Sequence, residues 1–306
     1  MLDFNMTKRK EKYLKFNAKI FSKLCTKTRY TKIIFKNQLK YKPDLKNPQT
    51  FCEKLNWLKL NYWPDNELAI KCTDKYLVRE YLEKNGLDQH LNELYGSWDD
   101  ARKIDFDKLP NQFILKCTHG CGFNIICEDK SKLDIKKTVK QLNKWLKEDY
   151  GTMLAEQHYS KCHKNARIIC EKFLGDDIRD YKFFCFNGEP EFMHVSAGCY
   201  EKKIRHSYFD KNGNPSTFRR KGRPEIENYK LSTEFEKMKD LSINLAKPFP
   251  FVRVDLFEVD GKLYFSELTF SPGACLIKFD PPETDKKLGD LLDIEPLIKE
   301  KTYEKK

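Results

Sequence analysis

The sequence predicts an α+β protein with largely antiparallel sheets and flanking helices. The clearest observations are two turn signals, Asn187-Gly188 and Asp260-Gly261, each between two apolar runs. Such dipeptides are typical of the two-residue turns that join antiparallel strands. The other helical and strand-like segments alternate irregularly, without the regular β-α-β order of a parallel sheet. The 306 residues, 40% of them hydrophobic, are enough for two or three packed lobes.

The first 46 residues are expected to form basic helices. Tyr13, Phe16, Ile20 and Leu24 recur at helical spacing, with lysines between them. This segment carries a net charge of +11 of the +12 of the whole chain, so the rest is nearly balanced. A balanced body argues against a general nucleic-acid-binding groove. We favour packing of the apolar stripe on the body, with contact to an anionic membrane or polymer as the alternative.

The body of the protein begins with two helices. Thr50 and Glu53 form a capping box, which starts a helix that runs through Leu60. Asp74 can cap a second helix, which ends where Gly86 offers a left-handed C-cap. Two later helices are expected, over Asp134–Leu146 and around Glu234–Ala246. Apolar runs predict strands at Gln112–Cys117, Asn124–Cys127, Arg167–Leu174, Tyr181–Phe186, Glu191–Val195, Phe251–Phe257 and Leu263–Phe270.

Cysteine usage and hydropathy indicate the cellular compartment. The 11 cysteines include no Cys-x-x-Cys pair, and several, such as Cys127, Cys170 and Cys185, stand inside apolar runs. That pattern favours reduced, buried thiols over a disulfide framework. No apolar run approaches the roughly 18 residues of a membrane span, and the polar N-terminus does not resemble a secretory signal. We expect a cytoplasmic protein, or one held at the inner face of the membrane by its basic segment.

The last hairpin carries carboxylates suited to a metal ion. Around the turn, apolar residues alternate with Arg253, Asp255, Glu267 and Thr269, so these four can share one sheet face. Neighbouring carboxylates repel unless a cation neutralises them, and Mg²⁺ is the natural occupant. A sheet with one solvated face would explain the same residues.

The spacing within this hairpin sets a geometric condition. Asp255 and Glu267 are 12 positions apart, so a plain two-residue turn at Asp260-Gly261 would place them on opposite faces. For both carboxylates to point the same way, we predict a three-residue loop or a β-bulge near the turn.

A second pattern joins a strand to a glycine-containing turn. Lys116 ends a strand, and Gly120 and Gly122 follow it. Backbone N–H groups in such a turn can cradle phosphates, whose charge the lysine can neutralise. Alone, the pattern also fits an ordinary hairpin turn. The thiols and the imidazole in this turn lack a second ligand pair, which argues against zinc.

Two further segments have meaning only beside these. Glu171, Phe173 and Leu174 follow an apolar strand, where a carboxylate and an aromatic ring can face adenine. Lys75 follows Asp74 at the start of the second body helix. Alone, the first is an ordinary strand end and the second a solvated helix lysine.

Seven segments together carry a resemblance to a known family. They are residues 47–55, 74–76, 116–124, 180–188, 249–255, 267–273 and 287–290. They resemble the signatures of the TupA-like ATP-grasp family, found in teichuronopeptide and capsular polysaccharide loci. The resemblance covers roughly residues 45–292. Two positions depart from the usual ATP-grasp pattern, because Thr269 stands in place of an asparagine and Cys121 in place of a serine.

The resemblance implies a role for each matching residue. The implied ATP site comprises Lys75, Lys116, His119, Gly120, Gly122, Glu171, Phe173, Leu174, Asp180 and Lys182. The implied Mg²⁺ ligands are Asp255, Glu267 and Thr269, and the implied catalytic residues are Arg253 and Lys116. Substrate candidates come from the cationic run after the central hairpin and from the segment after the metal strand. They are Lys203, Arg205, His206, Ser271 and Gly273.

The resemblance also implies a fold in which two antiparallel lobes hold ATP between them. We divide the chain into a basic helical segment (1–46), an N-terminal lobe (47–115), a small ATP-grasp lobe with the glycine loop (116–172), a large lobe with the metal hairpin (173–295) and a charged tail (296–306).

The implied activity is ATP- and Mg²⁺-dependent amide formation, in which a carboxylate is phosphorylated and an amine displaces the phosphate. The expected carboxylate is a uronic acid of a capsular or cell-wall polysaccharide precursor, and the expected amine is an amino acid or amino alcohol. A sugar kinase on the same ATP site, a glycosyltransferase using Asp105-Phe106-Asp107 and a non-catalytic binding module are the alternatives.

Overall fold

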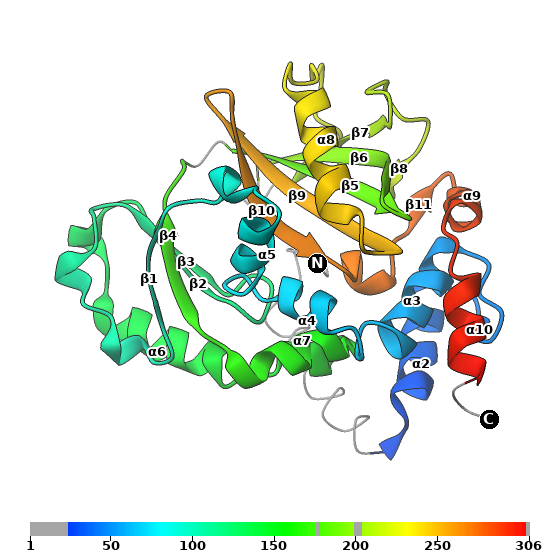
Figure 1. Ribbon diagram of the computed structural model, residues 1–306, viewed down its shortest axis with the longest axis horizontal. Coiled ribbons are helices and arrows are strands. Elements are labelled where there is room, and N and C mark those ends of the chain that lie inside the picture. The colour runs from blue at the N-terminus through cyan, green and yellow to red at the C-terminus, as the bar shows by residue number, and fades with distance from the viewer. Residues whose placement is uncertain (1–23, 176–177, 199–203, 304–306) are drawn as a thin grey trace.

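Two antiparallel sheets dominate the computed structural model, which describes residues 24–175, 178–198 and 204–303 (Figure 1). The smaller sheet has the order β1-β4-β2-β3, with β1 (Leu94–Trp98), β2 (Phe113–Cys117), β3 (Asn124–Cys127) and β4 (Ile168–Lys172). The larger has the order β10-β9-β5-β6-β7, with β5 (Arg179–Phe186), β6 (Glu189–Ala197), β7 (Arg205–Asp210), β9 (Phe251–Val259) and β10 (Lys262–Thr269). A third, two-stranded sheet pairs β8 (Arg219–Arg220) with β11 (Phe279–Asp280).

Helices cover one side of each main sheet. Helix α8 packs on β5, β6 and β9, where Phe183 stacks on Phe235 with 6.0 Å between ring centroids, and α6 packs on β2 (Figure 1). On the opposite face of the larger sheet, Phe251 packs against Phe51, with 5.3 Å between ring centroids, and polar side chains follow farther along β9. The described helices are α2 (Lys27–Leu39), α3 (Phe51–Asn61), α4 (Glu67–Thr73), α5 (Val78–Lys84), α6 (Ile135–Leu146), α7 (Gln157–Cys162), α8 (Phe235–Ala246), α9 (Thr284–Leu291) and α10 (Glu295–Tyr303).

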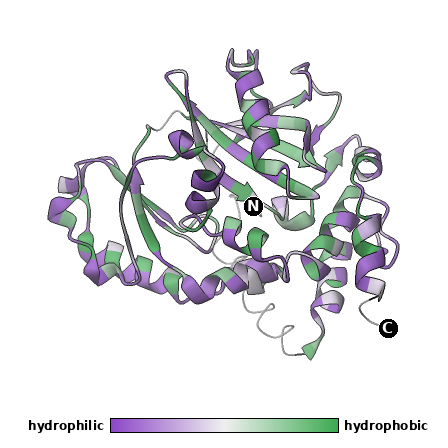
Figure 2. Cartoon of the chain, viewed as in Figure 1, coloured by the Kyte–Doolittle hydropathy of each residue, from purple (hydrophilic) through white to green (hydrophobic). Residues whose placement is uncertain are grey.

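Each main sheet has its own apolar core. The larger core contains Phe183, Phe251 and Leu245, and the smaller contains Phe113 and Leu142. Figure 2 shows mixed hydrophilic and hydrophobic residues along α6 and α10, as expected for helices that bury one face. Separate cores are consistent with two lobes around a shared cleft.

Most predicted elements are confirmed, because their signals are local. The Thr50–Glu53 capping box is formed, and Asp134 caps α6. Asn187 and Asp260 both have positive φ, as two-residue hairpin turns require. The second helix differs from the prediction, since α5 begins only at Val78; the Asp74 carboxylate instead accepts backbone N–H groups of the preceding turn.

The larger hairpin meets the predicted geometric condition through a bulge. The turn has two residues, but the register shifts between Phe265 and Glu267, which leaves Ser266 as the extra residue. Asp255 consequently lies opposite Glu267 and shares its face. This confirms the bulge prediction made from spacing alone.

The structure divides the chain differently from the sequence. The expected boundary between residues 115 and 116 cuts through β2, and β1, placed in the N-terminal lobe, pairs with β4. The smaller lobe therefore begins at β1, because strand pairing and not proximity in sequence defines it. The expected charged tail forms most of α10.

The basic segment is described only from residue 24, so the first half of it, with Tyr13, Phe16 and Ile20, lies outside the described residues. Helix α2 buries Tyr30, Thr31 and Phe35, as the packed alternative expects for this part. Among the described helices, none combines the length and apolar character needed to cross a bilayer. The Cys127, Cys170 and Cys185 thiols are free and buried, as predicted.

Candidate active site

The polar face of the larger sheet carries six side chains from three adjacent strands, here called the sheet cluster. They are Asp180 and Lys182 of β5, Arg253 and Asp255 of β9, and Glu267 and Thr269 of β10. Lys182 lies opposite Asp255, which lies opposite Glu267. Because facing residues of antiparallel strands point to one side, the hairpin and β5 bring these charges together.

Asp255 is fully buried and held by two cations. Arg253 donates from Nε to Oδ1 at 2.6 Å and from Nη2 to Oδ2 at 2.5 Å, and Lys182 donates to Oδ2 at 2.7 Å. A bidentate arginine adds directional as well as electrostatic stabilisation. Loss of one partner from such a buried pair typically costs about 3–5 kcal/mol, because a charge is left uncompensated.

Glu267 is held less directly than Asp255. Arg253 Nη2 lies 3.3 Å from its Oε1, and the Thr269 hydroxyl donates to the same oxygen at 3.0 Å. Arg253 also donates to the Thr269 hydroxyl oxygen at 3.0 Å. Burial alone would raise the pKa of Glu267, but the charges of Lys75 and Arg253 lower that pKa to about 2. The carboxylate is therefore ionised at neutral pH.

Asp180 occupies the least satisfied position of the sheet cluster. Lys182 donates to its Oδ2, whereas Oδ1 is buried without a hydrogen-bond partner within the described residues. Burial raises the pKa of Asp180 to about 6, partly offset by the Lys182 charge. Burial would lower the pKa of Lys182, but Asp180 and Asp255 raise it above the usual range. An unsatisfied buried oxygen indicates a position for an outside donor.

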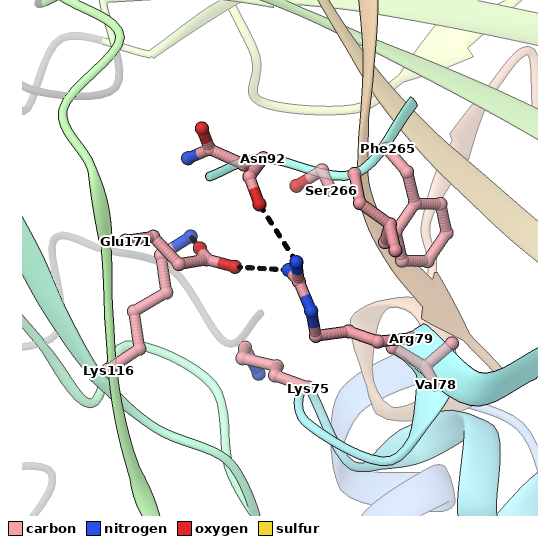
Figure 3. Close-up of a pocket in the computed structure, with 9 residues that line it drawn as sticks. Lys75, Val78, Arg79, Asn92, Lys116, Glu171, Phe265 and Ser266 are labelled. Carbon is pink, nitrogen blue, oxygen red and sulfur yellow. Dashed lines mark hydrogen bonds and ion pairs between the residues drawn. The ribbon is translucent and has the colours of Figure 1, made fainter. Parts of the chain in front are cut away.

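A second group of charges, here called the lobe cluster, lies at the smaller sheet (Figure 3). Lys116 of β2 donates to Glu171 Oε2 of β4 at 2.7 Å. Arg79 of α5 lies 3.4 Å from the other oxygen of Glu171 and donates to the Asn92 carbonyl at 3.0 Å. These residues line a small pocket whose other walls are Lys75, Val78, Leu91, Phe265 and Ser266.

Lys75 connects the two clusters. Its backbone N–H donates to the Thr118 carbonyl at 3.2 Å, and its Nζ donates to the Gly120 carbonyl at 2.7 Å. The same Nζ lies 3.8 Å from Glu267 of the sheet cluster. The Lys75 ammonium group therefore contacts both the glycine loop and Glu267, one of the expected metal ligands.

The two loop glycines serve different purposes. Gly122 has φ +76° in open space, a conformation that favours glycine in this turn. At Gly120, a Cβ atom would lie 2.8 Å from the Phe123 ring, so the absence of a side chain lets the loop pack on that ring. The loop is therefore shaped by its glycines on both its open and its packed side.

His119 is not brought to the lysines. It is fully buried, and its Nε2 lies 3.0 Å from the Glu148 carbonyl and 3.2 Å from the Trp145 carbonyl. Burial lowers the pKa of His119. The ring ties the loop to the end of α6, which differs from the expected contact with phosphates.

The remaining expected ATP residues lie between the two sheets. Phe173 and Leu174 are half-buried in the segment that leads from β4 to β5. Glu171 at the end of β4 and Asp180 at the start of β5 stand on either side of this connection. The chain therefore passes from the lobe cluster to the sheet cluster within a few residues.

The substrate candidates are not all brought together. Arg205 is exposed, while its neighbour His206 is buried on the other face of β7 and shares a hydrogen bond with Ser196. Gly273 has φ +58°, and a Cβ atom at this position would lie 3.1 Å from Ile277 Cγ1. Lys203 lies outside the described residues.

Ser271 belongs to a buried polar group that the sequence did not reveal. Its hydroxyl donates to Glu156 at 2.5 Å and lies 3.3 Å from His158 Nε2. Burial raises the pKa of Glu156 and lowers that of His158 to about 3. Ser271 is thus committed to internal contacts, behind the end of β10.

Two residues of the lobe cluster were missed by sequence reasoning. Arg79 stands four positions after Lys75 in the segment that the sequence predicts to be helical, and that i, i+4 spacing is a signal that could have indicated it. Asn92 contributes its backbone carbonyl, and its Nδ2 donates to the Lys172 carbonyl at 2.8 Å. No pattern in the sequence marks such a loop contact.

The rival metal motifs find no site. Asp105 pairs with Lys108 at 3.1 Å, and Phe106 between the two aspartates is buried in the smaller core. Within residues 24–175, 178–198 and 204–303, no group of three or more His, Cys, Asp or Glu side chains could hold a metal ion.

The sheet cluster fits Mg²⁺ as an incomplete oxygen site. Asp255 and Glu267 face each other, and Thr269 adds a hydroxyl oxygen beside Glu267. Mg²⁺ commonly takes one or two carboxylates and fills its other positions with water and phosphate oxygens. Asp255 and Glu267 match that pattern. Arg253, Lys182 and Lys75, which now contact these carboxylates, would turn toward the phosphate when the metal ion binds.

Comparisons with known proteins place the chain in a family. A family model described as "TupA-like ATPgrasp" matches residues 53–293. Among solved structures, the chain is similar to a D-alanine–D-alanine ligase from Bacillus anthracis, with 18% identity and a TM-score of 0.42 over 67% of this chain and 58% of that one. A D-alanine–D-alanine ligase from Helicobacter pylori gives 17% identity and a TM-score of 0.43, over 79% and 69%.

An L-amino acid ligase from Bacillus licheniformis gives 14% identity and a TM-score of 0.40, over 75% of this chain and 55% of that one. The chain spans little more than half the length of the first of these structures. No curated protein matches the chain. The assignment to a family therefore rests on the family model, which matches well over half of the chain.

Proposed function

The chain belongs to the TupA-like ATP-grasp family, and we propose that it is an ATP-dependent ligase that joins a carboxylate to an amine through an acyl phosphate. The observation that carries this proposal is the meeting of cations and carboxylates from two lobes. Lys75 links the glycine loop to Glu267, and Arg253 holds Asp255 beside it. Phosphoryl transfer needs such positioned cations far more than it needs covalent chemistry.

ATP would lie between the two clusters. Lys75 and Lys116 would contact its phosphates, and backbone N–H groups around Gly120 and Gly122 would cover them. Glu171, Phe173 and Leu174 would line the adenine, and Asp180 would accept a ribose hydroxyl with its unsatisfied oxygen. For Lys116 to reach a phosphate it must leave Glu171, whose charge Arg79 would continue to balance.

Asp255, Glu267 and Thr269 would hold Mg²⁺, which when bound supplies positive charge to the phosphate oxygens and helps to orient them. Arg253 would turn from the carboxylates toward the transferred group. It is partly buried and lies over the Phe184 ring, with 6.0 Å from its guanidinium carbon to the ring centroid. Its remaining hydrogen-bonding capacity can serve the transferred group.

The proposed reaction has two steps. The substrate carboxylate attacks the γ-phosphorus of ATP, the bond to the bridging oxygen breaks, and an acyl phosphate and ADP form. Arg253 and Lys116 neutralise charge on the transferred group. The amine then attacks the acyl carbon, loses a proton and expels inorganic phosphate, which leaves an amide. The glycine loop would exclude water, because water would hydrolyse the acyl phosphate.

We further propose that the carboxylate belongs to a uronic acid of a capsular or cell-wall polysaccharide precursor and that the amine is an amino acid or amino alcohol. The resemblance to a family from such loci supports the class of carboxylate.

The test is a screen of uronates against amino acids and amino alcohols, with ATP and Mg²⁺. Release of ADP and phosphate and the mass of the product are read together. We expect an amide that is one water lighter than its two reactants. A product that carries an extra phosphoryl group, without free phosphate, would support a sugar kinase instead. Transfer of a sugar without consumption of ATP would refute the ligase.

A further inference from the structure

The glycine loop between β2 and β3, residues 118–123, is fixed at its base by main-chain contacts. The Cys117 N–H donates to the Phe123 carbonyl at 2.8 Å, which closes the loop on itself. Thr118 makes two hydrogen bonds with Arg167, since its N–H donates to the Arg167 carbonyl at 2.9 Å and its hydroxyl accepts from the Arg167 N–H at 3.1 Å. The base of the loop is therefore tied to the strands of the smaller sheet.

His119 joins this loop to the C-terminal end of α6. Its side chain is fully buried, and its Nε2 lies 3.0 Å from the Glu148 carbonyl and 3.2 Å from the Trp145 carbonyl. Because a carbonyl oxygen can only accept, Nε2 carries the proton and donates to both. The last carbonyls of a helix have no partner within that helix. One imidazole N–H therefore satisfies two such carbonyls and links the loop to them.

The other nitrogen of the His119 ring gains nothing from burial. Nδ1 is buried, and it has no hydrogen-bond partner in the described part of the chain. A buried acceptor without a partner costs free energy, so such positions in a native protein call for an explanation. Burial also lowers the pKa of His119 and keeps the ring neutral. The contact made by Nε2 is the one that accounts for a histidine at this buried position.

Aromatic packing fixes the far side of the loop to the same helix end. The Phe123 ring stacks on Trp145, with 5.4 Å between ring centroids, and meets Tyr150 edge-on at 5.8 Å. Gly120 lies against the Phe123 ring, since a Cβ atom there would be 2.8 Å from it. The two residues between Gly120 and Phe123 are half-buried or exposed. The loop is therefore a short tip on a base that is anchored on both sides.

From these contacts we propose that His119 is a positioning residue, which holds the glycine loop where it can cover the acyl phosphate and keep water away. The proposal rests on the proposed ligase function. His119 itself touches no phosphate and acts through the loop. Lys75 Nζ donates to the Gly120 carbonyl at 2.7 Å, so a displaced loop would also displace this expected phosphate-binding cation. Water that reaches an acyl phosphate hydrolyses it, and ATP is then consumed without amide formation.

His163 provides a matched control. Its ring lies 5.0 Å from that of His119, and its Nε2 is 2.8 Å from the Leu146 carbonyl, at the same end of α6. It makes the same kind of contact, but it belongs to the turn that follows α7 and not to the loop. Leucine at this position removes the hydrogen bond and leaves a side chain that can pack against His119. The control therefore separates loss of stability at the helix end from loss of loop position.

The experiment compares the full-length wild type with His119→Leu, His119→Gln and His163→Leu. Glutamine can place an amide N–H where the Nε2–H of histidine stood, so His119→Gln tests for rescue. Hydrogen exchange of residues 118–123 is measured with and without β,γ-imido-ATP and Mg²⁺, together with the affinity for that nucleotide. The ratio of released phosphate to amide is then measured with the substrate pair that supports turnover. Thermal unfolding compares the stability of the variants.

We expect the loop amides of His119→Leu to exchange faster than those of the wild type. This variant should bind the nucleotide about tenfold more weakly and release about five times as much phosphate per amide, because the anchoring hydrogen bond is lost and water enters. His119→Gln should recover most of the affinity and of the wild-type ratio. His163→Leu should lose a similar amount of thermal stability but keep the wild-type affinity and ratio.

The proposal would be overturned if His119→Leu and His163→Leu had the same affinity and ratio, because His119 would then only stabilise the helix end. If His119→Leu does not fold, His119→Asn replaces it, since the shorter amide cannot reach both carbonyls. Wild-type values in His119→Asn would overturn the proposal as well. Faster exchange and weaker nucleotide binding in the His119 variant, with no amide from any substrate pair in the wild type, would support the anchor and refute the ligase function alone.

Discussion

The sheet cluster and the lobe cluster contain the same kinds of side chain in opposite states. In the sheet cluster, Asp255 is fully buried, and its oxygens accept from Arg253 of its own strand and from Lys182 of the adjacent strand β5. In the lobe cluster, Glu171 is shared by Lys116 and Arg79, which come from different elements at the edge of a pocket. A rigid sheet fixes the first set, whereas docking of α5 against the smaller sheet determines the second.

This difference indicates that the two clusters have different roles in the proposed reaction. Charges on neighbouring strands keep their spacing, as a site that must match one transition state requires. Charges on elements that pack across a cleft can exchange partners when a nucleotide arrives. Lys75, within reach of both, is the residue whose contacts must change most.

The largest effect on activity is expected from a substitution in the sheet cluster. Asp255→Asn should reduce turnover by about 10³-fold, because it removes a metal-type ligand and leaves Arg253 and Lys182 without their common carboxylate. The measurement is ADP release at saturating ATP. Glu258→Gln on the same strand, where the side chain points to the opposite face, is the control. Turnover within tenfold of wild type in Asp255→Asn would break the comparison.

The second prediction concerns the unsatisfied Asp180. Its pKa rises from the usual 3.8 to about 6, so the unfolded chain loses this proton first. Stability from this group is complete below pH 4 and is lost as pH rises through about 6, a change of about 3 kcal/mol. The Asp180→Asn variant should lack it.

Urea unfolding of both proteins between pH 4 and pH 7 measures this directly. The wild type should become less stable relative to Asp180→Asn as pH rises. A constant difference across that range would show that the carboxyl group is not strained by burial and would weaken the contrast between the two clusters.

Much of the fold and of the sheet cluster could be predicted, because both depend on local rules. Period-two alternation placed Arg253 and Asp255 on one face, and the even spacing to Glu267 required the bulge found at Ser266. The strand β1 was missed, since Leu94–Trp98 is half-buried throughout, contains Gly96 and shows no alternation. Its pairing with β4 moved the lobe boundary.

The features that were missed depend on contacts between distant segments. Arg79 contacts Glu171 because α5 packs beside the smaller sheet. His119 contacts the Trp145 carbonyl because α6 ends beside the glycine loop. A pocket at β7 likewise brings residues 215–219 together with Arg223, Glu225, Asp280 and Pro281. Residue spacing within one segment does not predict such contacts between distant segments.

A substitution in the lobe cluster should have a smaller effect on activity. Lys116→Met should raise the KM for ATP by about tenfold to a hundredfold, since one charge-assisted contact is worth about 1.5–3 kcal/mol. Lys172→Met, on the adjacent strand and exposed, is the control. An unchanged KM for ATP would mean that Lys116 serves only to hold Glu171, and the proposed exchange of partners would be wrong.

The smallest effect is expected at Thr269. Thr269→Val removes hydrogen bonds to Glu267 and Arg253, worth about 1 kcal/mol, and should reduce kcat/KM about fivefold. Thr269→Ser keeps the hydroxyl and should restore most of the activity. A loss of several hundredfold in Thr269→Val would instead identify the hydroxyl as an essential metal ligand.

The most direct test of the ligase proposal follows oxygen atoms. A uronate acceptor labelled with ¹⁸O in both carboxylate oxygens is incubated with ATP, Mg²⁺ and the amine that supports turnover, and the released phosphate is analysed by mass. An acyl phosphate predicts one ¹⁸O in the phosphate and one in the amide, because the carboxylate oxygen that attacks phosphorus leaves with it. Phosphate without label, with both labels kept by the saccharide product, would contradict carboxylate activation.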